Sequence, residues 1–291
     1  MARLIDKELV QRRFARTLQS YGEHAVVQRV MVQRLVTMVC DAWSAFAVPC
    51  SGAVGVDDGG PCFGRVLEVG AGTGALTVEL LRRARVEYYV ANDLVPACGA
   101  VLDELVNELA GEGLGVVGSV VEPAVRAGSF SFLAGDIERV VALPENLDLV
   151  VSNATVQWLS DLEGFVARVA KSLRSGGIFA FSSFGPENMR EIVALTGVGL
   201  RYRPLSGLVA LGGEWFEVLV QEESVQVEWF ASPGAVLEHL RRTGVNGVAG
   251  ERWSKGRYRA FVDEYGERFG VDGGVGLTYH PVFCCMRRIG R

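Results

Sequence analysis

Hydrophobic and polar positions follow two different rhythms along the chain. Between residues 7 and 48, apolar side chains recur three and four residues apart, as at Phe14, Leu18 and Tyr21, which predicts helices. From residue 65 onward, short apolar runs alternate with helical stripes over about 120 residues. Strands that alternate with helices are typical of βαβ units, so we expect an α/β fold with a mostly parallel sheet.

Each expected strand is a short apolar run, and each expected helix has an apolar stripe. The strands cover 65–70, 87–92, 130–134, 147–152, 177–182, 223–230 and 277–287, and the helices of this part cover 75–84, 96–110, 162–173, 186–195, 233–242 and 253–269. Three stretches rich in glycine or irregular in pattern interrupt the series: 49–61, 111–128 and 185–213. We therefore expect an N-terminal helical cap over 1–48 and a larger domain over 62–291, with a lid at 185–222.

Composition narrows the possible functions. Of 291 residues, 49% are hydrophobic and 22% are charged, which is typical of a folded globular protein. The net charge of −5 argues against a basic, nucleic-acid-binding surface spread over the whole protein. No apolar run reaches the ~18 residues of a membrane span. Six cysteines without CxxC spacing and three histidines argue against a metal site, so we expect a cytoplasmic protein that binds neither membrane, nucleic acid nor metal.

The most informative motif is a glycine loop between an expected strand and an expected helix. The sequence VLEVGAGTG places Gly70, Gly72 and Gly74 where the chain must turn sharply and where a ligand can lie against bare backbone. Asp93 follows Gly74 by 19 residues, at the end of the next strand, where an acid can accept hydrogen bonds from ribose hydroxyls. The alternative interpretation of the glycine loop is a plain strand–helix turn. The alternative interpretation of Asp93 is the N-cap of the following helix.

Glu68 distinguishes between two kinds of nucleotide-like ligand. Loops that bind the pyrophosphate of a dinucleotide have the spacing GxGxxG, whereas this loop is GxGxG and is preceded by an acid. A carboxylate beside the ligand repels a pyrophosphate and attracts a cation. This pattern disfavours a nicotinamide dinucleotide.

The glycine loop with its downstream acid resembles the first motif of class I S-adenosylmethionine-dependent methyltransferases, and the resemblance extends over about 65–182. It implies S-adenosylmethionine as cofactor and a doubly wound, Rossmann-like sheet of seven strands, the last one antiparallel, completed by a hairpin within 223–287. In that family an acid at the place of Asp93 binds the ribose, and the acid of the 135–137 turn approaches the adenine. The resemblance assigns nine residues to the cofactor: Glu68, Gly70, Gly72, Gly74, Asp93, Leu94, Asp136, Ile137 and Asn153.

Four further sequence segments resemble a narrower family within these methyltransferases. The segments at 14–29, 134–138, 147–158 and 277–280 resemble, in order, those of malonyl-acyl carrier protein O-methyltransferases of the BioC type. This resemblance implies methyl transfer to the free carboxylate of a malonyl thioester, on acyl carrier protein or coenzyme A, early in biotin synthesis. It also implies roles near the substrate for six residues: Tyr21, His24, Gln157, Trp158, Tyr279 and His280.

The expected chemistry requires little of the protein. A carboxylate with a solution pKa of roughly 4 is already ionised at neutral pH, so no general base is needed. Alignment and exclusion of water remain, and the sequence contains no Ser-His-Asp array. Tyr279 and His280 are neighbours in an expected strand and point to opposite faces, so at most one would face the pocket. Tyr21 and Trp158 could instead be core residues, and His24 a satisfied polar contact.

Arginines are the candidates for binding anionic groups. Arg201 and Arg203 lie in the expected lid and could hold the second carboxylate of malonate. An acidic carrier protein needs a local basic face, for which the sequence offers two runs: Arg12, Arg13 and Arg16, or Arg241 and Arg242. A solvated surface is the alternative for each. Two other functions stay open, a methyltransferase of another small acid or phenol, and a non-catalytic regulator that binds S-adenosylmethionine.

Overall fold

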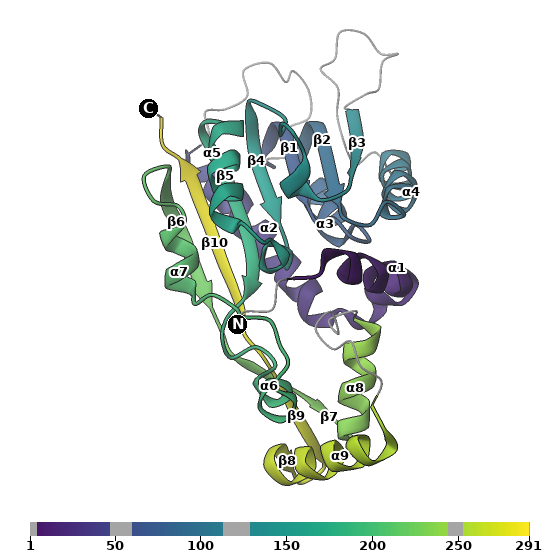
Figure 1. Cartoon of the computed structure of the whole chain (residues 1–291). Helices are drawn as coiled ribbons and strands as arrows, with labels where there is room; N and C mark the ends of the chain where they lie inside the picture. Colours follow the sequence, from purple (N-terminus) through teal and green to yellow (C-terminus); the bar gives the residue numbers. More distant parts are fainter. Residues whose placement is uncertain (1–4, 47–59, 113–128, 244–252, 291) are drawn as a thin grey trace.

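The computed structural model describes residues 5–46, 60–112, 129–243 and 253–290, and the side chains of residues 19–24 are not among the described ones (Figure 1). The linker 49–61 and the insertion 111–128 therefore fall almost wholly outside it. The helices are α1 Lys7–His24, α2 Val26–Phe46, α3 Ala75–Arg83, α4 Cys98–Gly111, α5 Leu162–Ser172, α6 Arg190–Thr196, α7 Leu205–Ala210, α8 Pro233–Arg242 and α9 Lys255–Phe269. The strands are β1 Cys62–Val69, β2 Arg85–Asp93, β3 Ser129–Ala134, β4 Leu147–Ser152, β5 Leu173–Phe184, β6 Phe216–Glu223, β7 Gln226–Phe230, β8 Gly270–Val271, β9 Gly274–Tyr279 and β10 Pro281–Arg288.

The main sheet has seven strands in the order β3-β2-β1-β4-β5-β10-β6. Strands β1 to β5 pair in parallel, and β10 runs antiparallel to both β5 and β6. The strand order reverses between β1 and β4, and at such a switch point the loops after the strands diverge and leave room for a ligand. The predicted fold, a doubly wound sheet with the last strand antiparallel, is confirmed.

The C-terminal strands differ from the prediction. The single strand expected at 277–287 is two strands, β9 and β10, in two different sheets, and the expected strand 223–230 is likewise divided into the end of β6 and β7. Every residue from Val275 to Met286 is buried, so the hydrophobic pattern does not mark the change of sheet at His280. The sixth strand of the main sheet lies instead at 216–223, so the stretch 185–222 that we expected to be a lid also contains most of a sheet strand.

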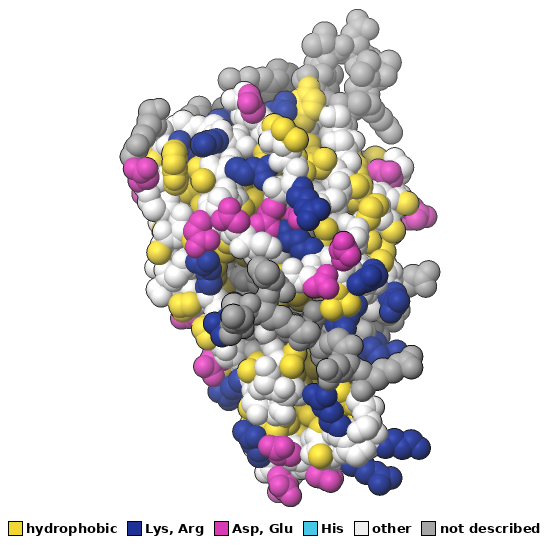
Figure 2. Space-filling model, viewed as in Figure 1, with side chains coloured by type: hydrophobic (Ala, Val, Ile, Leu, Met, Phe, Trp, Pro, Cys, Tyr) yellow, Lys and Arg dark blue, Asp and Glu magenta, His cyan; other side chains and the backbone are white. Residues whose placement is uncertain are grey.

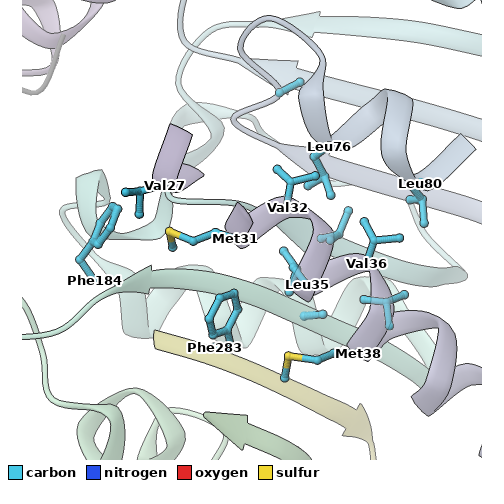
Figure 3. Packing of buried hydrophobic residues seen from close by; sticks show 14 of the residues in the cluster. Val27, Met31, Val32, Leu35, Val36, Met38, Leu76, Leu80, Phe184 and Phe283 are labelled. Atoms are coloured by element: carbon cyan, nitrogen blue, oxygen red, sulfur yellow. The ribbon is translucent and has the colours of Figure 1, made fainter. Parts of the chain in front are cut away.

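Helices cover both faces of the main sheet. Figure 3 shows Val32, Leu35 and Val36 of α2 packed near Leu76 and Leu80 of α3. These five side chains are at most 4% exposed and belong to one core cluster. Helix α5, with Phe165, Val166 and Val169 facing inward, belongs to a second cluster. Because α2 shares the main core, it is a layer of the α/β unit as well as part of the N-terminal helical pair.

The smaller sheet, in the order β7-β9-β8, forms the lower part of the molecule with α8 and α9 (Figure 1). Helix α1 lies between this part and the carboxyl ends of the parallel strands, and it contacts α8. Among the described helices, none combines the length and the apolar character needed to cross a membrane.

Candidate functional site

A cavity opens at the carboxyl ends of the parallel strands, beneath α1. It is lined by residues of the glycine loop and of the turns after β2, β3 and β4, together with one side of α1 and the start of α2. Eight of the nine predicted cofactor-binding residues line it: Glu68, Gly70, Gly72, Asp93, Leu94, Asp136, Ile137 and Asn153. The ninth, Gly74, does not. The fold therefore brings together residues that are up to 85 positions apart in the sequence.

The three glycines of the loop all have left-handed backbone conformations, with φ of 75° at Gly70, 55° at Gly72 and 85° at Gly74. A Cβ on Gly70 would collide with the side chain of Thr155, and a Cβ on Gly74 would lie 2.7 Å from Leu105. At Gly72 an added Cβ would meet no atom of the described residues within 4 Å. Gly70 and Gly74 thus permit close packing within the protein, whereas Gly72 presents bare backbone to the cavity.

Asp93 ties the glycine loop to the end of β2. Its carboxylate accepts hydrogen bonds from the backbone N–H of Gly72 at 2.8 Å and of Val95 at 2.7 Å. Burial raises the pKa of this carboxyl, although the two backbone donors act in the opposite direction. Asp93 does not cap α4, whose N-cap is Ala97. Its position in the lining of the cavity agrees with the predicted role toward ribose hydroxyls.

Glu68 is a carboxyl group with no exposed surface in the floor of the cavity. The hydroxyls of Thr77 and Tyr89 both donate to its Oε2, at 2.6 Å and 2.5 Å, whereas Oε1 has no hydrogen-bond partner among the described residues. Burial raises its pKa to about 7, with the nearby Asp93 adding to the effect and the two hydroxyls opposing it. A buried, half-satisfied carboxylate suits a positively charged ligand group, because such a group would supply the missing partner.

Two side chains of α1 hold that helix over the cavity, and sequence reasoning missed both. The ammonium of Lys7 donates to Asp136 Oδ1 at 2.7 Å and also pairs with Glu138. The amide of Gln11 donates to the backbone oxygen of Leu94 at 2.7 Å. Both contacts reach turns that the cofactor is predicted to touch. No local pattern announces them, because the partners lie more than 80 residues away in the sequence.

The turn after β4 contributes Asn153 and Trp158. The amide oxygen of Asn153 accepts a hydrogen bond from Ser182 Oγ at 2.6 Å, and its amide nitrogen donates to the backbone oxygen of Gln28 at 3.2 Å. Asn153 therefore links β5 to α2. Trp158 lines the cavity and meets the ring of Phe14 edge to face at a centroid distance of 6.1 Å. Gln157 lies outside the lining, and its amide donates to the Ala154 carbonyl, so it supports the turn.

The two C-terminal candidates lie away from the cavity lining. Tyr279 is fully buried, with its hydroxyl 2.6 Å from Nε2 of His239 on α8. His280 has its ring against Gly185 and its Nε2 3.1 Å from a carboxylate oxygen of Glu223.

The remaining sequence candidates are placed as follows. Tyr21 and His24 belong to α1, but their side chains lie outside the described part. Arg203 forms an ion pair with Glu163 at 2.7 Å, and Arg201 is exposed. Within the described ranges, no group of three or more His, Cys, Asp or Glu side chains could hold a metal ion.

Comparison with known proteins shows the family to which this chain belongs. A "Methyltransferase domain" family model matches residues 67–181. Proteins named malonyl-acyl carrier protein O-methyltransferase from Prosthecochloris aestuarii and Chlorobium luteolum are 42% and 44% identical to this chain over 98% and 99% of its length, covering 94% and 98% of theirs. The chain belongs to this family. Membership confirms the predicted family, the prediction of a methyltransferase and S-adenosylmethionine as its cofactor.

Solved structures of more distant proteins share the fold. The YcgJ protein of Bacillus subtilis matches with a TM-score of 0.53 and 16% identity, over 80% of this chain and 94% of that one. The N-methyltransferase NodS of Bradyrhizobium japonicum, solved with S-adenosyl-L-homocysteine, matches with a TM-score of 0.52 and 12% identity, over 96% and 98%. The site of this family member also fits its cofactor chemically, since Glu68 offers a carboxylate oxygen without a partner in the described part of the chain and Gly72 offers an open stretch of backbone.

Proposed function

We propose that the protein transfers the methyl group of S-adenosylmethionine to the free carboxylate of a malonyl thioester on acyl carrier protein. The observation that carries the proposal is the convergence of eight predicted cofactor residues on one cavity in a chain whose relatives, 42–44% identical, are named for this reaction. As an early step of biotin synthesis, the reaction would take place in the cytoplasm, as the sequence predicts.

When bound, S-adenosylmethionine supplies a methyl group that its positive sulfur already activates. The protein then needs to align the acceptor carboxylate with this methyl group and to exclude water, which together can contribute up to ~7–11 kcal/mol. In our proposal Glu68 and the Gly72 backbone orient the cofactor, and Asp93 and the Asp136 turn hold its nucleoside. Phe14 and Trp158 provide the apolar wall beside the acceptor.

No side chain needs to remove a proton, because the acceptor is ionised before it binds. The titratable groups that line the cavity in the described part of the chain are Lys7, Arg29, Glu68, Asp93, Cys98 and Asp136. The Cys98 thiol is hydrogen-bonded to Asp93, but burial raises the pKa of this thiol, so it is a poor nucleophile. Tyr21, His24, Gln157, Tyr279 and His280 remain proposed substrate-side residues. For Tyr279 and His280, whose rings lie outside the cavity lining, the proposal is an indirect role through the segment that links the two sheets.

The proposal is tested by incubating the protein with methyl-labelled S-adenosylmethionine and one acceptor at a time. Malonyl-carrier protein, malonyl-coenzyme A, free malonate and a phenol are compared at equal concentration. Labelling of a malonyl thioester supports the proposal, and preference for the carrier over coenzyme A supports its finer form. Labelling of only the free acid or the phenol contradicts it. Cofactor binding without labelling of any acceptor would indicate a regulator.

A further inference from the structure

Although the protein is acidic, with a net charge of −5, lysines and arginines outnumber aspartates and glutamates on the three helices α1, α8 and α9. The two arginine runs that the sequence offers as alternatives lie on adjoining helices, since α1 contacts α8. Helix α8 in turn contacts α9, whose first five residues carry Lys255, Arg257 and Arg259 and no acid. Figure 2 shows dark-blue side chains along the right and lower right of the molecule, where Figure 1 places these three helices.

The cationic side chains of this surface reach solvent. We call it the α1–α8–α9 face, and its exposed members are Arg12, Arg16, Arg241, Arg242, Lys255, Arg257 and Arg259. The side chains of Arg241 and Arg242 are 71% and 46% exposed. The carboxylate of Glu238 lies 2.7 Å from each of these two guanidiniums.

Helix α1 connects this face to the cavity. Its residues Lys7, Gln11 and Phe14 line the cavity, whereas Arg12 and Arg16, one turn apart, are exposed. This division follows from the helical period, which places residues three and four apart on one side. A partner bound to the outer side of α1 would therefore lie one helix diameter, ~10 Å, from the cavity.

We propose that the α1–α8–α9 face is the docking surface for an acidic protein partner, the carrier that presents the malonyl thioester. This inference rests on the proposed function and adds where the carrier binds. The occupant follows from charge complementarity: an acidic enzyme repels an acidic partner over most of its surface, so productive encounters are confined to a cationic face beside the cavity.

Charge reversal separates docking from chemistry. The double variant Arg16→Glu/Arg241→Glu changes one residue on each of two adjoining helices, and neither residue lines the cavity. The matched control, Arg65→Glu, reverses an exposed arginine in β1, before the strand reaches the glycine loop. Initial rates are measured with malonyl-carrier protein and with malonyl-coenzyme A, and the dissociation constant for S-adenosylhomocysteine is measured for each variant.

We expect the double variant to raise KM for malonyl-carrier protein about tenfold, with kcat, KM for malonyl-coenzyme A and cofactor affinity within about twofold of wild type. Added salt should weaken carrier use by wild type more than by the variant. An unchanged KM for the carrier, or an equal rise for both thioesters, would overturn the docking surface. A wild-type protein that does not methylate the carrier at all would instead refute the proposed function, and the docking inference with it.

Discussion

Removing the buried hydroxyl of Tyr89 tests the proposal that the carboxylate of Glu68 binds the positively charged amino group of the cofactor. In the structure, the Tyr89 hydroxyl donates to Glu68 Oε2 at 2.5 Å, and both residues have no exposed surface. The change Tyr89→Phe keeps the ring and removes only this donor. The control is Tyr88→Phe on the same strand, where the side chain is 47% exposed and points away from Glu68.

The size of the effect follows from the pKa of Glu68, which burial raises to about 7. At pH 7 about half of the carboxyl is therefore ionised in the free protein. A hydrogen bond to a charged group contributes roughly 1.5–3 kcal/mol, so its loss shifts the ratio of ionised to protonated carboxyl by about tenfold or more. The ionised fraction then falls from about one half to about one tenth. Because an ammonium group binds the ionised form, affinity should fall about fivefold at pH 7.

The difference in affinity between wild type and Tyr89→Phe should decrease as the pH rises. Raising the pH ionises Glu68 in both proteins, so at about pH 8.5 the difference in affinity should shrink to less than about twofold. Isothermal titration with S-adenosylhomocysteine, which keeps the cofactor's amino group, measures both values. Other ionisable groups around the cavity, Asp93, Lys7, Arg29, Cys98 and Asp136, are common to both proteins, so the comparison isolates Glu68. A loss of equal size at both pH values, or no loss at pH 7, would refute the reasoning.

Three further predictions concern the cavity. Gly72→Val should abolish S-adenosylhomocysteine binding, because its side chain enters the cavity, and the left-handed backbone should cost about 1–2 kcal/mol of stability; retained affinity would contradict the loop assignment. Gly74→Ala should mainly lower the melting temperature, since its Cβ meets Leu105 of α4, and a selective loss of binding would be the contrary result. Lys7→Met should accelerate hydrogen exchange in α1, because it removes the ion pairs with Asp136 and Glu138; unchanged exchange would show that these pairs do not hold the helix.

Much of the cofactor site could be predicted because its chemistry is local in the sequence. Gly70, Gly72 and Gly74 follow a buried strand directly, and the left-handed φ of each is a conformation that glycine adopts without strain. Asp93 was identified from its distance to this loop. Gly74 stays a predicted cofactor residue, although it does not line the cavity, because a glycine that permits helix packing and one that faces a ligand have the same sequence pattern.

The parts that sequence reasoning missed depend on contacts over long distances in the chain. Lys7 meets Asp136 across 129 positions, and Tyr89 meets Glu68 across 21, and neither pair has a local signature. The division of the C-terminal apolar run between two sheets at His280 was also missed, since burial is continuous through it. The resemblance places Tyr279 and His280 near the substrate, and this stays a prediction; in the structure the Tyr279 hydroxyl contacts His239 and the His280 ring contacts Glu223.

The central claim, methylation of a carrier-bound malonyl carboxylate, is tested most directly by the intact mass of malonyl-carrier protein after incubation with the enzyme and S-adenosylmethionine. The account predicts that malonyl-carrier protein gains the mass of one methylene group, that alkaline hydrolysis of this product releases methanol, and that acetyl-carrier protein, which lacks the free carboxylate, gains nothing. An unchanged mass of the malonyl form, or an equal gain on the acetyl form, would contradict it.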